Sequence, residues 1–224
     1  MTTRLFLVRH GATTLSVENR FAGSTDVELS DEGRDQVGHL AERLAPEKIA
    51  AVYASPLRRT IATAGILARP HRLEPLLDPG LREISHGHWE GLTRAEVEAQ
   101  FGIEYATWEQ DPYTFAPEGG ESGLSVLARV LPVIRHIVLN HPNGSVVVVS
   151  HKATLRLLLS SLLGIDPRGF RDRLEQSPAC LNVVDFKDVV RARLMLFNDV
   201  SHYTNRPSRT GNHLSKWWDA EKPG

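Results

Sequence analysis

The chain has 224 residues, of which 41% are hydrophobic and 24% charged, and its 26 basic and 27 acidic side chains give a formal net charge of -1. This composition is typical of a folded globular protein and excludes a disordered chain. Because the net charge supplies no overall positive field, we expect neither nucleic acid nor a membrane surface as a partner. The single cysteine, Cys180, excludes an internal disulfide framework and fits a reducing compartment.

The N-terminal apolar run, residues 5–8, ends at Arg9 and His10. It is too short for a signal-peptide core or a membrane span, so we expect a cytoplasmic location. A short apolar run that stops at a polar corner is typical of a strand buried on both faces, with its carboxyl end opening into a loop.

Strand and helix patterns alternate over the first two thirds of the chain, which predicts a largely parallel sheet with right-handed crossovers. Ser30 and Ser122 can each cap a helix, and Pro132 predicts a kink in the second one. The predicted strands are residues 5–8, 49–54 and 146–149, and the predicted helices are residues 30–45, a stretch ending near 68, a short one capped at Thr93, 122–139 and 153–163.

Two late apolar segments, residues 180–186 and 192–197, predict a hairpin. We therefore expect an α/β three-layer sandwich with a mostly parallel central sheet, an antiparallel edge strand and a helical or irregular cover insertion. One domain over residues 1–224 is expected, with the cover at about 84–121 and a polar tail at about 199–224. A frayed tail is the default, although Trp217 and Trp218 could place it over the site or in a subunit interface.

Polar residues follow three of the predicted strands: Arg9 and His10, then residues 55–59, then His151 and Lys152. The carboxyl ends of parallel strands line one crevice, so these side chains are expected to converge. Arginine forks grip phosphate oxygens, and a neutral imidazole can attack phosphorus. The set therefore suits a phosphate dianion, whereas the chain lacks the glycine-rich loop of nucleotide-binding enzymes.

The segment Leu-Val-Arg-His-Gly-Ala-Thr, residues 7–13, resembles the signature of the histidine phosphatase superfamily, also called phosphoglycerate mutase-like. Other segments match in the family's order, and the resemblance covers about residues 4–200. They are Arg20-Phe21-Ala22-Gly23, Leu29-Ser30-x-x-Gly33, Ser55 to Arg59 with Thr63, Leu81-Arg82-Glu83-Ile84, Gly87-x-Trp89-Glu90-Gly91, Gly119 to Ser122 and Val149-Ser150-His151. The resemblance implies a metal-independent phosphomonoesterase that needs no cofactor and acts on a small phosphorylated metabolite, often as a homodimer.

The resemblance also implies a role for each matching residue. His10 becomes phosphorylated, and Glu83 is the proton donor. Arg9, Arg59 and His151 hold the phosphoryl oxygens, and we expect the imidazole of His151 to be cationic. The implied substrate contacts are Ser16, which stands where the family usually has asparagine, together with Ala22, Gly23 and His86.

Lys152 departs from the family pattern, in which glycine normally follows the histidine. A lysine in the first turn of a helix opposes the helix dipole, which suggests that a negative ligand lies nearby. We hypothesise that Lys152 contacts a substrate carboxylate or second phosphate. The alternative is a lysine that extends into solvent.

Several alternatives stay open at this stage. His86 and His88 could bind a metal with Glu83, but three such residues on an irregular loop are more often polar cover, and no metal ligand is expected. The aromatic residues of the cover form either a lid over the pocket or a small satellite core: Trp89, Tyr105, Trp108, Tyr113 and Phe115. Phosphoglycerate mutase-type transfer and a non-catalytic phospho-ligand sensor are alternative functions. Hydrolysis is favoured because residues 84–150 lack the adjacent arginine pair that the mutases of this superfamily carry in that region.

Overall fold

The computed structural model describes residues 2–14, 20–204, 214–217 and 219. This part of the chain contains a six-stranded sheet with the strand order β3-β2-β4-β1-β5-β6. The strands are β1 Thr3–Arg9, β2 Ile49–Ala54, β3 Leu76–Leu77, β4 Ser145–Ser150, β5 Leu181–Phe186 and β6 Ala192–Asp199.

Strands β3, β2, β4 and β1 are parallel, and β5 pairs antiparallel with both β1 and β6. The late hairpin therefore lies at one edge of the sheet, and the predicted α/β class is confirmed. In the β1–β4 register Arg9 lies opposite Ser150, so His10 and His151 emerge from adjacent strands at the same level. A hydrogen bond from the His10 backbone N–H to the Ser150 carbonyl (3.1 Å) continues this pairing.

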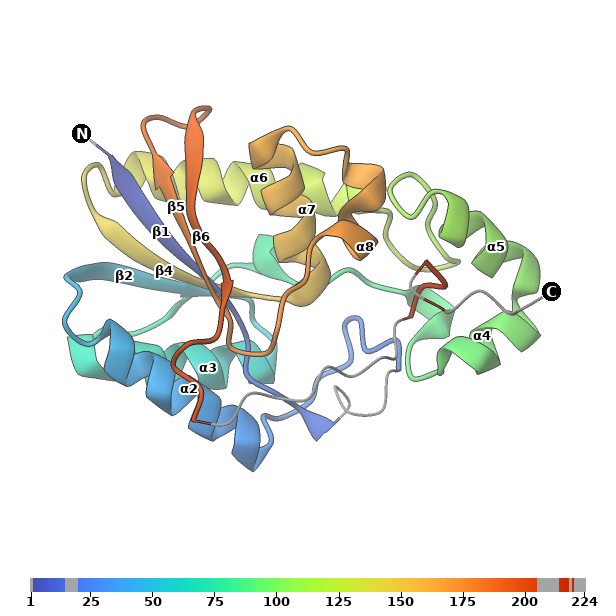
Figure 1. The fold of residues 1–224 in the computed structure, drawn as a ribbon, viewed down its shortest axis with the longest axis horizontal. Helices are drawn as coiled ribbons and strands as arrows, with labels where there is room; N and C mark the ends of the chain where they lie inside the picture. Colours follow the sequence, from blue (N-terminus) through green and yellow to red (C-terminus); the bar gives the residue numbers. More distant parts are fainter. Residues whose placement is uncertain (1, 15–19, 205–213, 218, 220–224) are drawn as a thin grey trace.

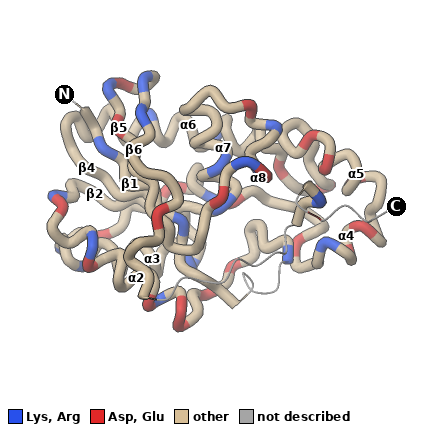
Figure 2. The backbone as a smooth tube through the Cα atoms, in the orientation of Figure 1, with Lys and Arg blue, Asp and Glu red and all other residues tan. Residues whose placement is uncertain are grey.

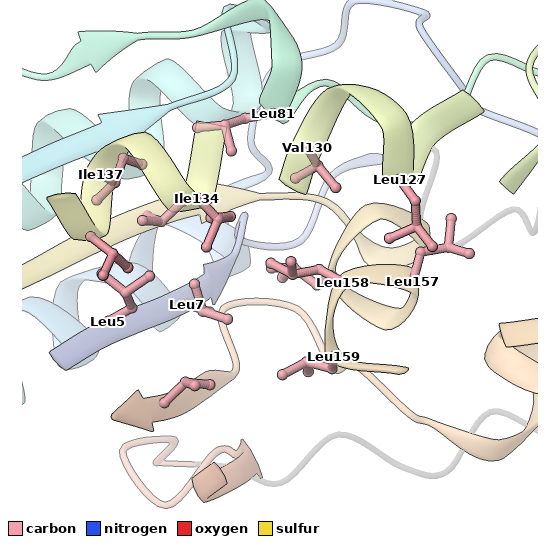
Figure 3. Close-up of a cluster of buried hydrophobic side chains, with 14 of the residues drawn as sticks. Leu5, Leu7, Leu81, Leu127, Val130, Ile134, Ile137, Leu157, Leu158 and Leu159 are labelled. Atoms are coloured by element: carbon pink, nitrogen blue, oxygen red, sulfur yellow. The ribbon is translucent and has the colours of Figure 1, made fainter. Parts of the chain in front are cut away.

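Helices cover both faces of the sheet, giving the three layers seen in Figure 1. On one face Phe6 and Val8 pack against α2 and α3, and on the other Leu5 and Leu7 pack against α6 and α7 (Figure 3). Alternate residues of β1 thus enter opposite cores, as expected for a strand buried on both faces. The principal covering helices are α2 Asp31–Leu44, α3 Arg58–Ala68, α6 Gly123–Asn140 and α7 Lys152–Leu163.

Helix α6 runs unbroken through Pro132, where the sequence predicted a kink. By length and composition α6 is apolar enough to cross a membrane. Its Val130, Ile134 and Ile137 are fully buried in the core with β1 and β4. The helix therefore has the position of a core helix in a soluble protein.

The cover between β3 and α6 contains a 3-10 turn, Gly87–Trp89, and the helices α4 Arg94–Gln100 and α5 Gly102–Gln110. In Figure 1 both helices lie at the end of the molecule away from β2. The rings of Trp89, Tyr105 and Trp108 are buried together with Phe21, and Phe115 packs against them. Tyr113 instead packs against the larger core of α6 and α7. Most of the cover aromatics therefore form the satellite core that the sequence left as one alternative.

Some short elements gave no signal in the sequence. Strand β3 consists of two leucines that are half exposed, and α5 leaves Ile103 almost fully exposed, so neither shows a regular apolar pattern. The 3-10 turn Pro167–Gly169 and the helix α8 Phe170–Arg173 are too short to display a helical period.

Two glycines let the loop after β1 lie directly on α2. A Cβ atom on Gly11 would come within 2.5 Å of the Gly33 carbonyl oxygen, and a Cβ on Gly33 within 2.1 Å of the Ala12 carbonyl oxygen. The Ser30 hydroxyl accepts from the Gly33 N–H (3.1 Å) and donates to the Ala12 carbonyl (3.2 Å). Close packing of backbone on backbone therefore fixes the loop that carries His10.

Candidate active site

The carboxyl ends of β1, β2 and β4 open toward one cavity of about 200 Å³. The sequence-predicted residues that line it are Arg9, His10, Ala22, Gly23, Arg59, Glu83, His86 and Lys152. His151 lies directly behind this lining, with its ring edge-to-face against that of His10 at a centroid distance of 5.2 Å. Ser16, the remaining predicted contact, lies outside the described residues.

The imidazole of His10 is held in one orientation. Its Nδ1 lies 2.7 Å from the Gly11 carbonyl oxygen, which can only accept, so Nδ1 carries the proton and Nε2 keeps its lone pair. Burial, reinforced by the nearby charges of Arg9 and Arg59, lowers the pKa of His10 well below its usual value. The ring is therefore neutral at physiological pH, as a nucleophile must be.

Arg59 is buried at the start of α3 and points into the site. Its Nε donates to Nδ1 of His151 (3.2 Å), and its terminal nitrogens donate to the carbonyl oxygens of Thr25 (2.7 Å) and Gly23 (3.0 Å). Because a guanidinium only donates, Nδ1 of His151 must accept. The other ring nitrogen, Nε2, then carries the proton and donates to the Ser55 hydroxyl (2.8 Å).

These contacts revise one expectation, the cationic imidazole of His151. Burial and the neighbouring Arg59 lower the pKa of His151 well below its usual value. In the free protein the ring is therefore neutral. Positive charge around the phosphate position comes from the arginines.

Arg9 is anchored from behind by a buried polar network. One terminal nitrogen of Arg9 donates to the Gln176 carbonyl oxygen (2.7 Å), and the Gln176 side chain bonds Asn182 (2.9 Å) and Cys180 (3.2 Å). Cys180 is a small buried group, and its burial raises the pKa of the thiol to about 12. The Arg9 Nε is buried and has no hydrogen-bond partner among the described residues, which leaves a donor for a ligand.

Glu83 faces the first turn of α7. Its carboxylate accepts hydrogen bonds from the backbone N–H groups of Ile84 (3.0 Å), Ala153 (3.2 Å) and Thr154 (3.2 Å), and from the Thr154 hydroxyl (3.2 Å). Two of these N–H groups are donors that a helix leaves unpaired at its N-terminus. The carboxyl group is thereby fixed at the edge of the cavity.

Lys152 does not extend into solvent. Its Nζ lies 3.1 Å from one oxygen of Glu175, whose other oxygen is 3.1 Å from Arg156. Although burial alone would raise the pKa of Glu175, the two cations lower it to about 2. The sequence predicted a negative ligand near Lys152. In the free protein the negative partner of Lys152 is the carboxylate of Glu175.

The two histidines of the cover lie in different surroundings. His86 lines the cavity and packs edge-to-face on Phe21, with ring centroids 4.9 Å apart. His88 instead pairs with Glu104, with Nε2 and Oε2 2.9 Å apart. Among residues 2–14, 20–204, 214–217 and 219, no group of three His, Cys, Asp or Glu side chains could hold a metal ion.

Sequence reasoning missed part of the cavity wall. Arg156 lines the cavity, and so do Leu214 and Ser215 from the tail. Trp108, one of the cover aromatics that the sequence offered as a lid, also lines it. The Tyr105 hydroxyl donates to the Leu214 carbonyl (2.8 Å), which ties this segment to α5. The default of a frayed tail is therefore wrong for residues 214–217. The helical spacing from Lys152 was the signal available for Arg156. Trp217 and Trp218 indicated a tail that could lie over the site, but no pattern marked Leu214 or Ser215, whose contacts are long-range.

Comparison with known proteins identifies this arrangement. The model of the histidine phosphatase superfamily (branch 1) matches residues 5–200. The chain belongs to the histidine phosphatase superfamily. It is 36% identical over 163 residues to phosphoserine phosphatase 1 of Hydrogenobacter thermophilus, covering 73% of this chain and 77% of that protein.

Other histidine phosphatases are similar over comparable lengths. The glucosyl-3-phosphoglycerate phosphatase of Mycobacterium tuberculosis is 36% identical over 168 residues, covering 71% of this chain and 75% of that protein. The native structure of a mycobacterial glucosyl-3-phosphoglycerate phosphatase superimposes with a TM-score of 0.80 at 31% identity, covering 88% of this chain and 99% of that one. With this family and these relatives, the protein is a phosphomonoesterase, a hydrolase.

Proposed function

We propose that the enzyme hydrolyses a small phosphorylated metabolite through a phosphohistidine formed on Nε2 of His10. The observation that carries the proposal is the buried, neutral imidazole, whose Nδ1 is held by the Gly11 carbonyl while Arg9 and Arg59 stand beside it. A nucleophile needs a free lone pair, and a transferring phosphoryl group needs positive charge around its oxygens.

In the first half-reaction, Nε2 of His10 forms a bond to phosphorus as the ester P–O bond breaks. The protonated carboxyl group of Glu83 gives its proton to the leaving oxygen, so that the organic part departs as an alcohol. Arg9 and Arg59 bind the equatorial oxygens, over which charge spreads in a loose transition state. His151 holds Arg59 in place through Nδ1.

In the second half-reaction, water replaces the alcohol. The Glu83 carboxylate takes a proton from this water as its oxygen bonds to phosphorus and the N–P bond breaks. Inorganic phosphate leaves, and His10 and Glu83 return to their starting protonation states. The balance is one ester and one water for one alcohol and one phosphate, and the charge is neutralised by arginines without a metal ion.

The cavity at His10 receives the phosphate, and the named relatives support a small metabolite as the substrate. The two named relatives act on phosphoserine and glucosyl-3-phosphoglycerate by their names. Ala22, Gly23 and His86 line the cavity and are proposed as contacts to the substrate. A cytoplasmic location is part of this proposal, since the one thiol, Cys180, is buried and unpaired.

Rapid quenching with a phosphorus-labelled ester tests the proposal. Wild-type enzyme pretreated with a chelator should retain activity and carry an acid-labile, base-stable label on His10. His10→Ala should lose both label and turnover, by about four orders of magnitude or more. His136→Ala, on an exposed position of α6, is the matched control and should behave as wild type. Label on another residue would contradict the proposal.

A further inference from the structure

One wall of the cavity carries two cations that the proposed chemistry does not use. Lys152 and Arg156 lie one turn apart on α7, and both line the cavity. Glu175, which contacts both, is not among the cavity-lining residues described. Figure 2 shows basic and acidic segments close together around α7 and α8, the helix that precedes Glu175.

Lys152 and Arg156 both pair with one carboxylate, that of Glu175. Asp172 and Glu83, which also line the cavity, add further negative charge near Arg156. The Arg156 side chain is only 8% exposed, and its Nε is buried with no hydrogen-bond partner in the described part of the chain. A buried guanidinium donor without a partner costs free energy unless a ligand satisfies it.

We propose that Lys152 and Arg156 form a second anion subsite, which selects phosphomonoesters whose organic part carries a carboxylate. The subsite rests on the proposed function, because the phosphate of such a substrate must lie at His10. A carboxylate can offer one oxygen to each cation. Glu175 is a positioning residue that aligns both cations from outside the cavity.

The electrostatic surroundings agree with this assignment. Burial, together with Arg156 on the same helix and Arg9 on β1, lowers the pKa of Lys152 to about 8, and Glu175 offsets only part of this effect. A bound carboxylate relieves the repulsion among Lys152, Arg156 and Arg9.

A matched pair of esters tests the subsite at neutral pH. The organic part of 3-phosphoglycerate ends in a carboxylate, and that of glycerol 3-phosphate ends in a neutral hydroxymethyl group. We expect wild-type kcat/KM to favour 3-phosphoglycerate by about tenfold or more, the size of one hydrogen bond to a charged group. Lys152→Met should lower this ratio about tenfold. Lys48→Met, on an exposed turn before β2, is the control and should leave both the ratio and the rates unchanged.

Glu175→Gln separates an electrostatic subsite from a merely structural ion pair. Glutamine keeps one acceptor oxygen, so it can bind only one of the two cations, and it removes the competing charge, so the ratio should rise. A fall in the ratio for both Lys152→Met and Glu175→Gln would overturn the subsite. Wild-type hydrolysis that depends on His10 but shows no preference for the carboxylate would also overturn it, leaving the phosphohistidine proposal intact. Turnover that is indifferent to His10→Ala would instead overturn the proposed function.

Discussion

The two ends of the cavity are built differently. At the phosphate end, His10 and Arg59 are held by backbone carbonyls of Gly11, Thr25 and Gly23. At the far end, Lys152 is held by a side-chain ion pair and remains 35% exposed. Backbone contacts survive most substitutions, whereas an ion pair changes with either partner. The chemistry is therefore fixed by the fold, and the choice of substrate by exchangeable side chains.

The largest loss of activity is expected from a substitution at the phosphate end, at Arg59. Arg59→Lys keeps the charge but loses the fork that bonds His151, Thr25 and Gly23 at once, so kcat/KM should fall by about two to three orders of magnitude. The neighbouring Arg58→Lys is the control, because the Arg58 side chain is 66% exposed and pairs with Asp26 and Glu28. Steady-state kinetics on one ester measures both. Equal losses would show that the buried fork has no special role.

The burial of the two histidines can be measured through stability. The pKa values of His10 and His151 are lowered in the folded protein, so below the usual histidine pKa of about 6.5 the unfolded chain binds more protons than the native one. The free energy of unfolding should then decrease as pH falls below this value, by up to about 1.4 kcal/mol per histidine per pH unit. Urea unfolding measured one pH unit above and one pH unit below the usual histidine pKa tests this.

The matched variants for this test are His151→Gln and His136→Gln. Only the first should flatten the pH dependence, because His136 is exposed on α6. An unchanged slope in His151→Gln would mean that His151 is not neutral in the folded state.

The role of Lys152 at the far end can be tested through its pKa. Burial, Arg156 and Arg9 lower this pKa to about 8, although Glu175 acts to raise it. Lysine is charged below its pKa and neutral above it. From one unit below to one unit above, the preference for 3-phosphoglycerate over glycerol 3-phosphate should therefore fall about tenfold. A pH series of kcat/KM for both esters measures it, and Lys152→Met should show a flat ratio. A ratio in wild type that does not change with pH would contradict the assignment.

The smallest effect is expected at the tail. Leu214→Ala removes apolar contact from the cavity wall and should raise KM about fourfold with little change in kcat. Fourfold corresponds to ~0.8 kcal/mol, the burial of one of the three carbon groups that the substitution removes. Leu163→Ala, at the partly exposed end of α7, provides the same substitution away from the cavity. A change in kcat larger than that in KM would place the tail in the chemistry instead.

The sheet and the phosphate end were predictable because their signals are local. The apolar runs of β1, β2 and β4 each stop at a polar corner, and Ser30, Thr93 and Ser122 do cap helices as predicted. Once parallel strands were inferred, the meeting of their carboxyl ends followed.

The far end was less predictable because it depends on distant pairs. Glu175 meets Lys152 only through the packing of the segment after α8 on α7, and no periodicity marks that contact. The protonation of His151 likewise depends on burial and on Arg59, which a motif does not encode. Leu214 is held at the cavity by the bond of its carbonyl to Tyr105, by packing on the satellite core and by the contacts of Arg94 with Ser215 and Asp219, all of them long-range.

The contact between Gly11 and Gly33 has an evolutionary consequence. A Cβ atom on Gly11 would meet the Gly33 carbonyl oxygen, and one on Gly33 would meet the Ala12 backbone, so neither position has room for a side chain. A substitution at Gly33 would displace the loop of His10 without touching any reacting atom. In a saturation library, tolerance should therefore be lost at a helix position outside the cavity, while cavity-lining positions such as Leu214 accept replacements. Substitutions that adapt such an enzyme to new substrates are therefore expected at the far end of the cavity, away from the loop that these two glycines hold.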